Sequence, residues 1–143
     1  MVTELRLDDE GERLKSAAME RLVRQMPSGA KCIFLNCEMR DSPGGMALSD
    51  DLFAVVKPVF GKPRRVAMEL DADAFKLLVA LGRHVLAAGA QSHVTVDLII
   101  HPRGACQAFR DDSPLRRLGG GERAFREKHK AYAEIEPWLA AVE

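Results

Sequence analysis

The chain has 143 residues, of which 47% are hydrophobic and 29% are charged, and its 21 Lys and Arg balance its 21 Asp and Glu. This composition is typical of a single globular domain and excludes a disordered chain, and the balanced charge does not favour binding to nucleic acid or to an anionic membrane. No apolar run approaches the ~20 residues of a membrane span, and the charged stretch at residues 1–15 is unlike a secretory signal, so we expect a cytoplasmic protein.

Residues 8–26 predict the first helix. Asp8 or Asp9 can cap its start, and Pro27, Ser28 and Gly29 end it. Apolar residues recur at helical spacing along its buried stripe, at Leu14, Ala18, Leu22 and Met26. Residues 30–40 then alternate between two faces, which predicts a strand. One face of this strand carries Ile33, Leu35, Cys37 and Met39.

Residues 46–63 leave two interpretations open. The run Leu52 to Val56 fits a short strand or one helical turn, because periodicity cannot separate the two over so few residues. Pro58, Gly61 and Pro63 interrupt the remainder of this region. Residues 64–70 alternate again and predict a strand.

Residues 71–88 predict the second helix, capped by Asp71 or Asp73. Gly89 stands where a left-handed C-terminal cap belongs. The expected buried stripe consists of Phe75, Leu78, Val79, Gly82, Val85 and Leu86.

Residues 93–110 predict a β-hairpin. Val94, Val96, Leu98 and Ile100 alternate with polar residues, and the turn at 101–104 contains Pro102 and Gly104. A loop over 111–121 and a last helix over 122–134 complete the chain. The sequence therefore predicts one α+β domain over residues 1–143, with an antiparallel sheet of four to five strands and helices packed mainly on one face.

The thiols and imidazoles do not form a recognisable reaction centre. Cys32 and Cys37 lie five residues apart on one predicted strand, so their side chains point to opposite faces. His93 and His101 are separated by roughly 26 Å of extended chain at about 3.3 Å per residue and cannot share a metal ion. The three cysteines, without CxxC spacing, fit reduced thiols. We therefore predict no catalytic, cofactor-binding or metal site, and we expect more readily a binding protein than an enzyme.

Basic residues dominate the C-terminal part, with eight Lys and Arg against four Asp and Glu between residues 103 and 130. A solvated face is the ordinary explanation, and a patch that meets an acidic protein is the functional one. Aromatic residues are scarce there, which argues against a groove for single-stranded nucleic acid. The candidate interaction residues are Arg103, Arg110, Arg116, Arg117 and Arg123, and Lys57, Lys62, Arg64 and Arg65 could extend the same surface.

The order of elements resembles the YezG-type immunity proteins of bacterial toxin systems. The resemblance spans roughly residues 14 to 118 and rests on Met26-Pro27, Leu77 to Leu81, and Thr95-Val96-Asp97-Leu98 through Gly104 to Phe109. Two departures are Ala90-Gln91-Ser92 where that family tends to have Trp, and a less acidic composition. The resemblance implies a small cytoplasmic binding protein without catalysis.

The sequence supports two functional hypotheses. The first is a non-enzymatic module that binds a protein partner and no membrane, with a homodimer left open. The second is a small-molecule-binding or enzymatic domain with a pocket between the sheet and the helix at 71–88, lined by Cys37, His84, His101 and Arg103.

Overall fold

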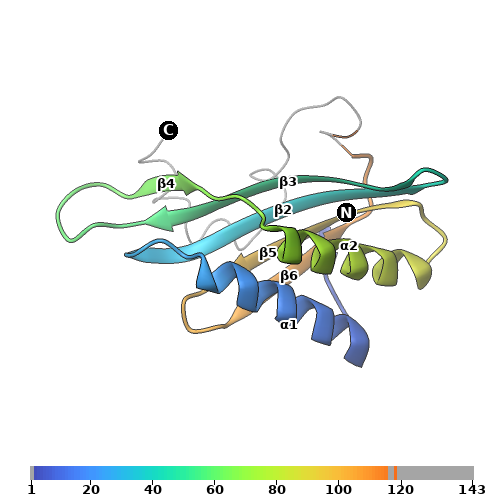
Figure 1. The fold of residues 1–143 in the computed structure, drawn as a ribbon, viewed down its shortest axis with the longest axis horizontal. Helices are drawn as coiled ribbons and strands as arrows, with labels where there is room; N and C mark the ends of the chain where they lie inside the picture. The colour runs from blue at the N-terminus through green and yellow to red at the C-terminus, as the bar shows by residue number, and fades with distance from the viewer. Residues whose placement is uncertain (1, 116–117, 119–143) are drawn as a thin grey trace.

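The computed structural model describes residues 2–115 and residue 118. They form two helices and a six-stranded antiparallel sheet in the order β1-β6-β5-β2-β3-β4 (Figure 1). The elements are β1 (Val2–Glu4), α1 (Asp9–Arg24), β2 (Ala30–Ser42), β3 (Gly45–Val56), β4 (Arg64–Ala67), α2 (Ala72–Ala87), β5 (His93–Ile100) and β6 (Cys106–Asp111). The predicted α+β class is confirmed. The last predicted helix, at 122–134, lies outside the described residues.

The sheet has six strands where four to five were expected, and β1 is the strand that was not predicted. β1 has only three residues, and its register with β6 begins at Val2 opposite Asp111. Three residues are too few to show the alternation that identifies a strand in a sequence. β1 is therefore a strand because it pairs with β6, and its local sequence pattern does not predict it.

Both described helices pack on the same face of the sheet (Figure 1). One core cluster joins Leu14 and Leu22 of α1, Leu78 and Leu81 of α2, and Leu35 of β2. The alternation predicted for residues 30–40 is confirmed, since Ile33, Leu35, Cys37 and Met39 all belong to this cluster.

Carboxylates cap both helices, as the sequence predicts. The N–H of Gly11 donates to Asp8 over 2.8 Å, and the N–H of Ala74 donates to Asp71 over 2.7 Å. The predicted left-handed cap at Gly89 is wrong, because the C-cap residue of α2 is Ala88 in a right-handed conformation and Gly89 does not have a positive φ.

The predicted stripe of the second helix is shifted. Phe75 is 42% exposed and Val79 is half-buried, and Ala74 and Leu81 occupy buried positions instead. Packing against α1 as well as the sheet sets the rotation of α2, and the sequence of one helix does not contain that information.

Region 46–63, for which the sequence left a strand or a helical turn open, contains most of one long strand and a loop. β3 runs from Gly45 to Val56 and pairs with β2 from Ser42 opposite Gly45 back to Cys32 opposite Val55. Residues 57–63 form the loop to β4. The predicted strand at 64–70 is shorter, ending at Ala67.

The face of the sheet opposite the helices carries a second apolar cluster. It consists of Cys32, Phe34, Phe53, Val55 and Ile99, with Phe109 packed against it. The rings of Phe34 and Phe53 stack with 5.4 Å between their centroids. Cys32 and Cys37 therefore lie on opposite faces, as predicted.

The hairpin predicted at 93–110 is formed by β5 and β6, with Gly104 at φ +88° in its turn. The N–H of His101 donates to the carbonyl of Ala105 and closes this turn. In the part of the chain that the structure describes, neither helix has the length and apolar character needed to cross a membrane.

Candidate functional site

Two adjacent apolar side chains stand in solvent on the loop between β3 and β4. Val59 and Phe60 are each 92% exposed, whereas the next most exposed large hydrophobic residue of the described chain, Phe75, is 42% exposed. This loop extends beyond the end of the sheet (Figure 1). Single exposed apolar residues are common on protein surfaces, and an adjacent pair, each 92% exposed on a projecting loop, makes this loop the candidate contact site.

The backbone of this loop is restricted. Pro58 and Pro63 each fix their own φ, and Gly61 takes φ +123°, which residues with a side chain rarely adopt. A Cβ at Gly61 would lie 3.2 Å from Cγ of Pro58. The N–H of Lys57 donates to the carbonyl of Gly29 and ties the start of the loop to the segment before β2. The loop is therefore restricted at its first residue and at its two prolines, and Val59 and Phe60 lie between the prolines with 92% of their surface exposed.

The register of the sheet brings three basic segments to the same end as this loop. Ala30 lies opposite Val56, Val56 opposite Arg64, and Ile33 opposite Ile100, so residues 27–35, 52–68 and 98–108 share one end of the sheet. These segments contain six Lys and Arg and no Asp or Glu. We call this region the basic end, and it consists of Lys31, Lys57, Val59, Phe60, Lys62, Arg64, Arg65 and Arg103.

Most of these cations are available to a partner. Lys31, Lys57, Lys62, Arg64 and Arg103 are exposed, and no ion pair among the described residues involves them. Arg65 differs, because its guanidinium lies 3.9 Å from the centroid of the Phe53 ring. This cation–π contact fastens β4 to the second apolar cluster.

The other end of the sheet is acidic. The strand residues beyond the row formed by Leu52, Leu35, Leu98 and Ala108 include seven carboxylates and two arginines. The carboxylates are Glu4, Glu38, Asp41, Asp50, Asp51, Asp97 and Asp111, and the arginines are Arg40 and Arg110. The zero net charge of the chain therefore conceals a sheet whose two ends have opposite sign.

The structure separates the predicted interaction residues. Arg103 is exposed in the turn between β5 and β6, at the basic end. Arg110 lies opposite Val96 toward the acidic end, and its Nη2 is 2.8 Å from an oxygen of Asp112. Arg103 precedes β6 in the turn, and Arg110 lies four residues beyond the first residue of β6, or roughly 13 Å along the strand at about 3.3 Å per residue. Arg116, Arg117 and Arg123 lie outside the described residues.

The structure also does not bring together the residues of the alternative pocket. Cys37 is fully buried in the middle of β2, opposite Val96 on β5. His101 comes directly after β5, five residues beyond Val96, or roughly 16 Å at about 3.3 Å per residue. The space between the sheet and α2 at this point is filled by buried side chains such as Leu78 and Met39.

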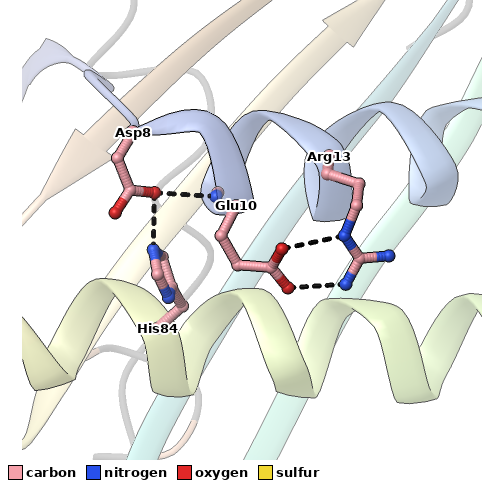
Figure 2. Close-up of polar contacts among 5 residues, drawn as sticks. Asp8, Glu10, Arg13 and His84 are labelled. Atoms are coloured by element: carbon pink, nitrogen blue, oxygen red, sulfur yellow. Dashed lines mark hydrogen bonds and ion pairs between the residues drawn. The ribbon is translucent and has the colours of Figure 1, made fainter.

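His84 connects the two helices. Its Nε2 lies 2.7 Å from Oδ1 of Asp8, the same oxygen that accepts from the N–H of Gly11 (Figure 2). The hydrogen bond from Gly11, followed by the one with His84, lowers the pKa of the Asp8 carboxyl. The contacts of His84 are therefore those of a residue that stabilises the packing of α2 on the start of α1.

The thiols of Cys32 and Cys106 are poor nucleophiles. Burial raises the pKa of Cys32 to about 12 and also raises the pKa of the half-buried Cys106. All three cysteines are free thiols, and the described residues contain no group of three or more His, Cys, Asp or Glu that could hold a metal ion.

Sequence reasoning missed Val59 and Phe60. Pro58, Gly61 and Pro63 were used only as breaks between elements. The signal that could have identified these two residues is an apolar pair between a proline and a glycine, in a stretch otherwise composed of turn residues and lysines.

Known proteins provide no further evidence about this site. No protein-family model, no curated protein and no solved structure matches the chain.

Proposed function

We propose that this protein is a non-enzymatic module that binds another protein. The exposure of Val59 and Phe60, at 92% each, is the observation that carries the proposal. Burying a Val or Phe side chain in a partner contributes about 1.5–3 kcal/mol each before the costs of association are subtracted. Together with a restricted loop, this is enough for one side chain to act as the centre of an interface.

The proposal extends to an antitoxin-like role in the cytoplasm. The resemblance to YezG-type immunity proteins supports it, and in that case the partner is a toxin. Free thiols at Cys32, Cys37 and Cys106 agree with a reducing compartment.

Co-purification tests the proposal. The tagged full-length chain, expressed at its natural level in its native host, should recover one protein in a stoichiometric amount. A chain that elutes alone, and whose melting temperature rises in the presence of a metabolite from a thermal-shift panel, would identify a small-molecule-binding protein instead.

A further inference from the structure

We infer that the partner presents an apolar pocket framed by carboxylates and that it docks on the basic end, with Phe60 in the pocket. This inference rests on the proposed function and specifies the chemistry of the partner.

The charge of the basic end selects the partner. Within residues 27–35, 52–68 and 98–108 every charged side chain is a cation, although the whole chain is neutral. Such a concentration of one sign does not follow from composition. It attracts an acidic surface over a Debye length of about 8–10 Å and raises the rate of encounter.

The apolar residues and the cations are arranged as the centre and rim of one contact. In the same loop, Lys57 lies three residues before Phe60 and Lys62 lies two residues after it. Arg64, four residues after Phe60, is the first residue of β4. Val59 and Phe60 lie between the two lysines in the sequence and are each 92% exposed. Interfaces typically bury an aromatic anchor at the centre and keep charged side chains at the rim, where they select the partner.

The shape of the loop favours a protein pocket over a lipid surface. Pro58 and Pro63 fix φ on either side of the tip before any partner is bound. A pocket of fixed shape gains affinity from such restriction because less conformational entropy is lost on binding. Lipid tails adapt to any side chain and gain little from it.

Matched variants of the full chain test this contact with the partner purified by co-purification. Phe60→Ala should weaken binding about 10–100-fold, whereas Phe75→Ala, the matched exposed phenylalanine on α2, should leave it within about twofold. Lys62→Glu should slow association in low salt, and the effect should decrease between about 50 and 500 mM salt. Lys76→Glu on α2 is its matched control.

Cross-linking locates the partner surface. A benzoylphenylalanine incorporated in place of Phe60 should cross-link to an apolar segment of the partner that is flanked by Asp and Glu, and the same group in place of Phe75 should not cross-link. Circular dichroism and thermal melts should be unchanged in all loop variants, because the loop lies outside the core.

The outcomes separate the two proposals. A recovered partner that binds Phe60→Ala and Lys62→Glu as tightly as the wild type refutes docking on the basic end and leaves the protein-binding function intact. Recovery of no partner refutes the function. Two further results overturn the inferred occupant. One is Phe60-dependent sedimentation with phosphatidylcholine–phosphatidylserine vesicles mixed at about 7:3. The other is Phe60-dependent dimerisation in analytical ultracentrifugation.

Discussion

Gly82 tests how tightly α2 is packed on the sheet. It is a buried residue of α2, and a Cβ added there would overlap Sδ of Met39, which is itself fully buried on β2. Adding a methyl group to a filled core typically costs about 1–3 kcal/mol, and replacing Gly by Ala within a helix recovers about 1 kcal/mol. Because the overlap involves a side chain with no exposed surface, we expect the upper part of that range and a net loss of about 1–2 kcal/mol.

Thermal unfolding measures this loss. For a chain of this length, Gly82→Ala should lower the melting temperature by about 3–8 °C. Gly89→Ala is the control, since no atom lies within 4 Å of its Cβ position. That variant should change stability by less than about 0.5 kcal/mol.

A second background makes the test sharper. Met39→Val removes the overlapping Sδ. The side chain then ends at Cγ, and in Met39 this atom lies 3.6 Å from the added Cβ, which is an ordinary contact distance. In that background Gly82→Ala should become stabilising, so the two substitutions should show strong coupling. A Gly82→Ala variant as stable as the wild type, or the same loss in both backgrounds, would refute the packing described for α2 and β2.

Three further predictions concern local contacts. Asp71→Ala should lower the melting temperature more than Asp73→Ala, because Asp71 caps α2 and also accepts a hydrogen bond from Arg21 on α1, whereas Asp73 is 63% exposed. Asp8 stabilises the fold at pH values above its ordinary pKa, and this contribution disappears as the pH falls through its lowered pKa. Urea titrations should therefore show that the stability of Asp8→Asn depends less on pH, between about 5 and 2, than the stability of the wild type does. An unchanged dependence would contradict the lowered pKa. In the native protein, iodoacetamide should label Cys106 before Cys32, because Cys32 is 1% exposed and its pKa is raised to about 12. Mass spectrometry follows the labelling, and faster labelling of Cys32 would show that β2 opens locally.

Local chemistry was sufficient wherever the relevant contacts lie within one element. The caps at Asp8 and Asp71 join residues three apart, and Gly104 in its turn requires only its own φ. The alternation along residues 93–100 likewise belongs to a single strand. For this reason both helices, the hairpin and the α+β class could be predicted from the sequence.

Pairing between distant segments decided the rest of the fold. Val2–Glu4 is a strand only because β6 lies beside it, and Gly45–Val56 is a strand along its whole length because β2 pairs with all of it. The exposure of Phe75 depends on how α2 is rotated against α1 and the sheet. These outcomes depend on surfaces that the local sequence does not contain.

The candidate site shows the same division. The sequence by itself determined the charges, the prolines and glycine of the loop, and the apolar character of Val59 and Phe60. Only the tertiary structure placed Lys31, Lys57 and Arg103 at one end of the sheet, because an antiparallel register aligns residues that are tens of positions apart in the chain. It also placed Arg110 with the carboxylates at the other end, since a hairpin folds back on itself and carries the second strand away from its turn.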